Sequence, residues 1–272
     1  MSRTQIAIIP PELLLKAYRV GIFPMSDSRD DPEVYWVEPK QRAILPLDGF
    51  HMSKSLARTL RRERFHVTCN AAFDAVIDAC AAPRAEAETS WISERISGSY
   101  RELHRLGHAH SIETWTVSDE GVPALVGGLY GVGFGRVFCG ESMFSRASDA
   151  SKVALAWLVA AMRRAGCEVL DCQFTTSHLA SLGSIEISQA QYLERLRSAL
   201  RPDQAGAAGA VAGGGADFGP GSGLGAGFGA GFGRSFAASV AGGFAALLED
   251  AALAGLSSSP GNFIAQSFTH TS

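Results

Sequence analysis

Two short stretches of the sequence carry polar side chains that can act on an amine or a carbonyl group. In LDCQ, Asp171 and Gln173 are two residues apart on a predicted strand, so their side chains extend from the same face. An acid beside an amide can hold the amide in one orientation, and a fixed amide can orient an amine or a carbonyl. The alternative interpretation is a strand end that meets solvent.

The second stretch is FCGESMF, in which Glu141 stands between a pair of small residues and a Met-Phe pair. A carboxylate among apolar neighbours is costly to bury without a partner. Glu141 is therefore either an ordinary strand end that meets water or the polar floor of an apolar pocket.

A basic stripe follows one predicted helix. Between His51 and Arg64 there are five Lys or Arg residues and one Glu, and four of the basic residues have the spacing i, i+4, i+7 and i+8 of one helix face. These four residues are Lys54, Arg58, Arg61 and Arg62. The stripe is either a solvated face or a contact for a phosphate backbone. Arg101 and Arg105, on a later predicted helix, are candidates to extend it.

Aromatic and imidazole side chains leave further alternatives open. Trp36 in YWVEP and Trp91 in TSWIS fit either the core or stacking on a nucleobase near a loop. In HRLGHAH, His104, His108 and His110 span the end of a helix and the start of a strand, so their side chains should diverge. A structural role for these histidines is favoured over a zinc site.

The stretch GLYGVGFGR contains Gly131, Gly133 and Gly135, which do not open a helix after a strand and so do not fit a dinucleotide-binding loop. A glycine-rich hairpin turn fits better, because glycine tolerates positive φ. The sequence also has no GxxxxGK[ST] nucleotide loop.

The elements that must position these residues are predicted from periodicity and from the residues that cap and end helices. A capping box at Ser188 and Gln191, an N-cap at Ser53 and another at Asn70 are the clearest helix starts. The predicted order mixes helices and strands, which indicates a mixed α/β (α+β) fold. Predicted helices cover 11–21, 53–63, 71–81, 93–107, 151–166 and a segment from 188, and predicted strands cover 33–37, 42–45, 65–69, 110–117, 124–131, 136–140 and 167–173.

Composition bounds the class of protein. The 272 residues are 46% hydrophobic with a formal net charge of −3, which is enough for a sizeable core and argues against a bulk polycation. Five cysteines without a C-x-x-C spacing indicate reduced thiols in a cytoplasmic protein. The N-terminus does not resemble a signal peptide, and no apolar run is long enough to cross a bilayer.

The composition changes abruptly near Pro202. Seventeen of the 30 glycines follow residue 201, and lysine is absent from there on. Such a segment buries too little surface to offset its ordering entropy, so we expect residues 202–272 to form a disordered Gly/Ala-rich tail with one short helix in FAALLEDAALAG.

Taken together, five blocks resemble the bacterial leucyl/phenylalanyl-tRNA–protein transferases. The blocks are GIFPMS, WISERISGSYRELHRLGHAHSIETW, VGGLYGV, FCGESMFSRASDASK and LDCQFTTSHLASLG, within a match from Leu13 to Leu196. The resemblance implies a small N-terminal domain (1–48) and an acetyltransferase-like (GNAT-like) catalytic domain (49–201), followed by the tail (202–272).

This resemblance also implies the reaction. Members of the family are aminoacyltransferases that move leucine or phenylalanine from aminoacyl-tRNA to the N-terminal Arg or Lys of a protein, which marks that protein for degradation. The aminoacyl ester is already activated, so no ATP, metal or redox cofactor is expected. We expect a cytoplasmic monomer whose partners are Leu-, Phe- or Met-tRNA and proteins with N-terminal Arg or Lys, with no membrane partner.

Site residues follow from the matching motifs. Asp171 and Gln173 match the catalytic pair, with Gln173 at the attacking amine, and Glu141 is expected to hold the donor's α-amino group. Trp36 and Trp91 match positions near the terminal adenosine, and the basic helix is expected to contact the acceptor stem. The further residues expected to bind substrate are Leu129, Phe138, Met143, Phe144, Ser145, Leu158, Leu170 and His178.

Two other functions stay open from the sequence. An acetyltransferase-like fold also suits an acyl-CoA-dependent N-acetyltransferase, although the Q/R-x-x-G-x-G/A loop of such enzymes is missing. A non-catalytic tRNA-binding module is the other alternative.

The sequence departs from the family pattern at two places. Near Trp36, WVEP replaces W-S-P, and Leu158 stands where an aromatic residue can occur in other members.

Overall fold

A computed structural model of the chain describes residues 7–83, 89–201, 234–253 and 260–268. The helices are α1 (Pro11–Arg19), α2 (Lys54–Arg61), α3 (Phe73–Ala81), α4 (Glu94–Arg105), α5 (Ala150–Arg164), α6 (Ser177–Ser181), α7 (Gln189–Ala199), α8 (Arg234–Leu253), α9 (Pro260–Ser267) and the short 3₁₀ turn η1 (Leu47–Gly49). The strands are β1 (Phe23–Met25), β2 (Tyr35–Val37), β3 (Gln41–Leu45), β4 (His66–Cys69), β5 (Ala109–Val117), β6 (Pro123–Phe134), β7 (Val137–Ser145), β8 (Val169–Gln173) and β9 (Ile185–Ser188).

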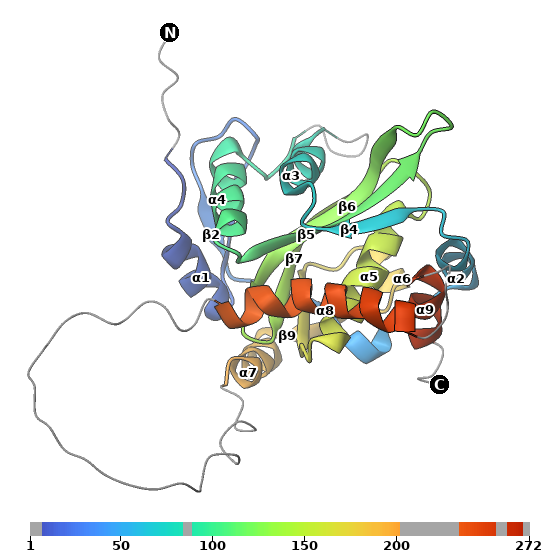
Figure 1. The fold of residues 1–272 in the computed structure, drawn as a ribbon. Coiled ribbons are helices and arrows are strands. Elements are labelled where there is room, and N and C mark those ends of the chain that lie inside the picture. The colour runs from blue at the N-terminus through green and yellow to red at the C-terminus, as the bar shows by residue number, and fades with distance from the viewer. Residues whose placement is uncertain (1–6, 84–88, 202–233, 254–259, 269–272) are drawn as a thin grey trace, which may run out of the picture.

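One seven-stranded sheet organises the molecule, in the order β4-β5-β6-β7-β8-β3-β9 (Figure 1). Its neighbours are antiparallel except β7 and β8, which run parallel and are joined through α5. The predicted mixed α/β class is confirmed. Strand β3, which lies within the predicted N-terminal domain, pairs with β8 and β9 in this sheet, whereas β1 and β2 form a separate two-stranded sheet.

The sheet is covered by helices on both faces. Helices α1, α3 and α4 bury apolar side chains on one face, and α5 with α8 packs on the other (Figure 1). Helix α5 buries 12 of its 15 residues, so it is enclosed between the sheet and other helices rather than half exposed. This arrangement fixes β7, α5 and β8 around one another.

Local sequence signals explain most helix ends. Ser53 and Ser188 accept backbone N–H groups at the starts of α2 and α7, and the capping box with Gln191 is complete, as predicted. The prediction for Asn70 is wrong: its side chain bonds to His110 and to the backbone of Ser111. The buried carboxylate of Glu113 instead accepts the free N–H groups of Ala71 and Ala72 at the start of α3.

Of the glycines at positions 131, 133 and 135 in GLYGVGFGR, only one turns the chain. Gly135 has a φ of +57° and lies between β6 and β7, whereas Gly131 and Gly133 lie within β6. At Gly131 a Cβ atom would come within 2.4 Å of the Phe138 ring, so this glycine leaves room for that side chain. The predicted hairpin is confirmed, but its turn is shorter than expected.

The prediction of a disordered tail is wrong for the two C-terminal helices. Helix α8 contains the predicted short helix and packs along α5, with Phe244 against Trp157 at a ring separation of 5.2 Å. At Gly243 a Cβ atom would lie 2.4 Å from the carbonyl of Ala161, so glycine permits this close approach. Residues 202–233 lie outside the described part of the chain.

Helix α9 completes the cover. Its Ile264 is fully buried, and the guanidinium of Arg163 on α5 lies 4.6 Å from the centre of the Phe268 ring just beyond it. Apolar residues of α8 and α9 pack on the apolar surface of α5. This contact buries the apolar area that the composition of the tail did not predict. Across the residues that the structure describes, no helix combines the length and apolar character needed to cross a membrane.

If α8 is part of the core, Phe244→Ala should lower the free energy of unfolding by about 3 kcal/mol, because truncating a buried phenylalanine removes its transfer energy and leaves a cavity. Urea unfolding measures the effect. Leu253→Ala on the same helix is the control, since Leu253 is 86% exposed and should change stability by less than about 0.5 kcal/mol. Equal small effects would show that α8 does not pack as described.

Candidate active site

A cavity of about 880 Å³ opens beside β7 and β8. Side chains from both strands line it together with residues of β6, α5 and the segment around α6. Leu129, Leu158 and Leu170 form an apolar part of its wall, and Glu141 and Gln173 lie at the same cavity. The predicted strands therefore bring the two polar stretches of the sequence to one place.

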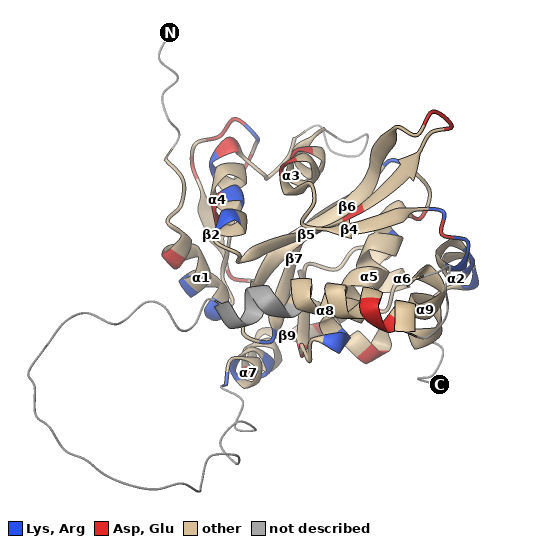
Figure 2. Ribbon diagram, in the orientation of Figure 1, with Lys and Arg blue, Asp and Glu red and all other residues tan. Residues whose placement is uncertain are grey.

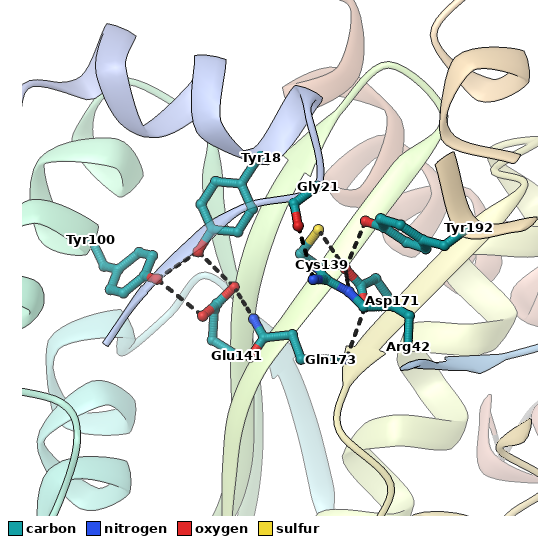
Figure 3. A network of polar contacts seen from close by, with 9 residues as sticks. All are labelled: Tyr18, Gly21, Arg42, Tyr100, Cys139, Glu141, Asp171, Gln173 and Tyr192. Carbon is teal, nitrogen blue, oxygen red and sulfur yellow. Dashed lines mark hydrogen bonds and ion pairs between the residues drawn. The ribbon is translucent and has the colours of Figure 1, made fainter. Parts of the chain in front are cut away.

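Glu141 reaches this place through an irregularity in β7. Tyr130 pairs with Ser142 and Gly131 pairs with Gly140, so Glu141 has no partner residue on β6. An extra residue of this kind bends a strand and redirects its side chain. Glu141 is 8% exposed, and its carboxylate accepts hydrogen bonds from three side chains of other elements, namely Tyr18, Tyr100 and Gln173 (Figure 3).

The carboxyl group of Glu141 titrates close to neutral pH. Burial raises its pKa to about 7, and the negative charge of Asp171 adds to the rise. The hydrogen bonds from Tyr18, Gln173 and Tyr100 favour the ionised form and lower the pKa, but by less. The net rise shows that the donated hydrogen bonds do not fully replace the water that burial removes.

Asp171 is held by a buried arginine from β3. Arg42 donates from Nε to Oδ1 at 2.9 Å and from Nη2 to Oδ2 at 2.5 Å, and both side chains are almost completely buried. The guanidinium lies between the rings of Phe23 and Tyr192, 4.7 and 4.5 Å from their centres, and also donates to the carbonyl of Gly21. Tyr192 donates a further hydrogen bond to the Asp171 carboxylate (Figure 3).

Gln173 ends β8 in the left-handed region, with a φ of +61°. Its backbone N–H donates to Asp171 Oδ1 at 2.8 Å, which holds this uncommon conformation, and its side-chain Nε2 donates to Glu141 Oε1 at 2.9 Å. The acid therefore orients the amide through the backbone, and the amide points to Glu141.

Most residues that the sequence assigns to substrate binding line this cavity. They include Trp91, Leu129, Met143, Phe144, Ser145, Leu158, Leu170 and His178. Phe138 is not among the lining residues: it is fully buried and its ring lies against Gly131, so its contact with the substrate side chain stays a prediction. Trp36 is 41% exposed on β2 and is not among the lining residues either.

Comparison with family models assigns both parts of the chain. A family model described as "Leucyl/phenylalanyl-tRNA protein transferase" matches residues 44–197, and the model of that family's N-terminal domain matches residues 8–40. The chain belongs to the leucyl/phenylalanyl-tRNA–protein transferase family.

Relatives of the same name support this assignment to the transferase family. A leucyl/phenylalanyl-tRNA–protein transferase of Novosphingobium aromaticivorans is 65% identical over 272 residues, 100% of both chains. One from Zymomonas mobilis is 58% identical over 193 residues, 71% of this chain and 70% of that protein. Among solved structures, the match to L-PGS from Bacillus licheniformis covers 62% of this chain and 55% of that chain at 14% identity, with a TM-score of 0.31.

Four residues of this site were missed from the sequence. They are Tyr18, Arg42, Tyr100 and Tyr192, which come from α1, β3, α4 and α7. Only Arg42 gives a signal, because it occupies a short apolar strand, RAIL, where a charge needs a buried partner. The tyrosines fit the core pattern equally well.

The basic residues fall into two separate groups. Lys54, Arg58, Arg61 and Arg62 border a second cavity of about 870 Å³ beside α2. Arg101 bonds to Asp74 and Asp78, and Arg105 bonds to Glu102, on α3 and α4 at the other side of the molecule (Figure 2). The expectation that Arg101 and Arg105 extend the stripe of α2 is wrong, because α4 lies far from α2 (Figure 2).

The three histidines of HRLGHAH make separate local contacts. His104 stacks on Phe73 at a ring separation of 4.2 Å and bonds to the carbonyl of Ala109, while His110 meets the amide of Asn70. Within the described residues, no three His, Cys, Asp or Glu side chains are placed to bind a metal ion.

Arg42→Met should destabilise the protein by about 3–5 kcal/mol, because it leaves Asp171 buried without its partner. The double variant Arg42→Met with Asp171→Leu should recover much of this loss, since no buried charge remains uncompensated. Arg101→Ala is the control and should cost less than about 1 kcal/mol, as its ion pairs are solvated. Urea unfolding of the four proteins compares these values, and a mild Arg42→Met effect would contradict the role given to the pair.

Proposed function

We propose that this protein transfers leucine or phenylalanine, with methionine as a further donor, from aminoacyl-tRNA to the N-terminal Arg or Lys of acceptor proteins. The observation that carries the proposal is the apolar cavity with the hydrogen-bonded Glu141 and Gln173 side chains at its wall. Membership of the transferase family agrees with this chemistry. The product gains an N-terminal residue that serves as a degradation signal.

The geometry suits transfer from an ester to an amine. An aminoacyl ester is already activated, so the protein has to hold the carbonyl, meet the amine and favour the charge that develops in the transition state. Gln173 has a fixed amide for the attacking amine, and Asp171 fixes Gln173 through its backbone. No cofactor is part of this proposal.

Side-chain selection is assigned to the apolar wall of the cavity. Leu129, Leu158 and Leu170, together with Met143 and Phe144, offer surface for a leucine, phenylalanine or methionine side chain. Such a wall discriminates by about 1–3 kcal/mol per methylene, so related apolar side chains should all be accepted. Trp91 at the same cavity and Trp36 outside it are proposed to contact the terminal adenosine, with Ser145 and His178 as further cavity contacts.

The remaining expectations on organisation belong to the same proposal. The parallel β7–β8 pair joined through α5 supports an acetyltransferase-like catalytic domain behind a small N-terminal domain. We propose a cytoplasmic, monomeric enzyme. The family match does not favour the acyl-CoA-dependent alternative or a non-catalytic tRNA-binding module.

The purified protein with Leu-tRNA and an Arg-initiated peptide should yield a peptide with leucine added at its N-terminus, detected by mass spectrometry. Gln173→Ala should lower turnover by about 100-fold or more while tRNA affinity changes little, because it removes the group that orients the amine. An acetylated N-terminus is the control acceptor and should receive nothing. Absence of transfer with Leu-, Phe- and Met-tRNA alike would refute the proposed function.

The basic stripe of α2 should bind the tRNA backbone without reading its sequence. Arg58→Ala with Arg61→Ala should weaken tRNA binding and reduce the slope of log K against log salt by about 1–2, because two phosphate contacts are lost. Arg101→Ala with Arg105→Ala is the matched pair and should change the slope little, since these arginines already face acids. Fluorescence titrations over a salt series compare the variants, and an equal change in both pairs would speak against a specific role of α2.

A further inference from the structure

Three oxygen-to-oxygen contacts join Tyr18, Tyr100 and Glu141 into a closed ring (Figure 3). The hydroxyl of Tyr18 lies 2.7 Å from Oε1 of Glu141, and the hydroxyl of Tyr100 lies 3.0 Å from Oε2. The two hydroxyl oxygens are 2.5 Å apart. These distances are those of O–H···O hydrogen bonds.

The number of hydrogen atoms identifies the protonation state of this ring. The two tyrosines supply two hydroxyl hydrogens, whereas the three contacts need three. Gln173 adds none to the three contacts, because it donates from outside the ring to Oε1 of Glu141. In a closed ring the third hydrogen comes from a protonated Glu141 carboxyl group, which then donates to one tyrosine instead of accepting from it. If Glu141 is ionised, both tyrosines donate to it and their oxygens face each other with nothing between them, so the ring opens.

The surroundings of the ring allow both states near neutral pH. Burial raises the pKa of Glu141 to about 7, and the charge of Asp171 on β8 acts in the same direction. Arg42 on β3, the nearby cation, is engaged with Asp171. The remaining titratable neighbours are Cys139 on β7, whose own pKa burial raises well above its usual value, and Tyr130 on β6 beside Tyr100.

We propose that Glu141, positioned by the hydroxyls of Tyr18 and Tyr100, is the proton acceptor of the transfer reaction; this inference rests on the proposed function. Glu141 borders the cavity, whereas Asp171 is fully buried and held by Arg42. Gln173 is a neutral amide and a poor base. Glu141 is thus a catalytic residue, and the two tyrosines are positioning residues that act through it.

The step balances in atoms and charge. The acceptor enters as an α-ammonium group with three hydrogens, and ionised Glu141 takes one of them. The neutral amine attacks the ester carbonyl carbon, a carbon–nitrogen bond forms, and the carbon–oxygen bond to the tRNA ribose breaks. A second hydrogen from the nitrogen goes to the leaving ribose oxygen, and the third stays on the new amide. One net proton is left on Glu141, where the ring closes, and it then passes to water.

This role differs from that of a carboxylate that only binds an ammonium group. A binding carboxylate should stay ionised throughout the working pH range. A proton acceptor should have a pKa near the working pH, and it gives a rising rate as it ionises. The closed ring stabilises the protonated form and the two donated hydrogen bonds stabilise the ionised form, so both states have partners for their polar atoms.

The first test observes the ring without any reaction. The infrared carbonyl band of a protonated carboxyl group should disappear from the wild-type protein as pH rises from about 6 to about 8, and the band should be missing in Glu141→Gln. Glu120→Gln, at an exposed position of the β5–β6 hairpin, is the matched control and should keep the band. A wild-type protein without a titrating band overturns the proposal, whether or not the protein transfers leucine.

The second test separates proton acceptance from binding. With an Arg-initiated peptide, Glu141→Gln should lower kcat by about 10²–10⁴-fold, as expected for loss of a general base. An aminooxy group in place of the α-amine is already neutral at pH 7 and releases no net proton, so Glu141→Gln should lower its rate by less than about 10-fold. Equal losses with both acceptors overturn the role of proton acceptor. If the wild type transfers leucine to neither acceptor, the proposed function fails. The infrared test then still shows whether Glu141 titrates within the ring.

The tyrosines are tested through the pH profile. In Tyr18→Phe and Tyr100→Phe the ionised carboxylate loses a donated hydrogen bond, which is stronger than the corresponding bond to the neutral acid, so the rising limb of kcat/KM should move to higher pH. Tyr35→Phe, at a 45% exposed tyrosine outside the ring, is the control and should leave the limb in place. A lower rate with an unmoved limb in both ring variants would mean that the tyrosines only support the fold.

Discussion

The buried ion pair between Arg42 and Asp171 is the interaction on which the rest of the site depends. A charge pair without solvent is stable only when nearly every polar atom around it has a partner. Here the carboxylate is also bonded to Tyr192 and to the backbone N–H of Gln173, and the guanidinium to the carbonyl of Gly21. The pair thereby fixes the N-terminal segment, β3, β8 and α7 relative to one another.

The second constraint is the irregularity of β7. A regular strand would alternate its side chains between the two faces, but the extra residue at Glu141 changes this alternation where the cavity opens. The carboxylate then meets hydroxyls from α1 and α4, which lie on the same face of the sheet, and an amide from β8. One displaced residue thus joins parts of the chain that are more than 100 residues apart.

The C-terminal helices show how composition can mislead. The high glycine content after Pro202 predicts disorder. Composition alone does not show that apolar surface elsewhere in the chain, on α5, has to be covered. Helix α5 is apolar around nearly its whole circumference, which indicates a helix covered on more than one side. The cover comes from Phe244 and Leu247 of α8 and from α9, and glycine at position 243 lets α8 approach closely.

The sequence alone determined the mixed fold class, most helix ends and the family, because caps, glycine stops and long motif blocks are local signals. Residue types and spacing made Glu141, Asp171 and Gln173 candidates, and the family resemblance assigned them to the site. Only the tertiary structure decided their partners. Arg42, Tyr18, Tyr100 and Tyr192 come from four elements far apart in the chain, and no periodicity reports a bond between them. The near-neutral pKa of Glu141 was likewise beyond the sequence, since it arises from burial, and burial is a property of the assembled molecule.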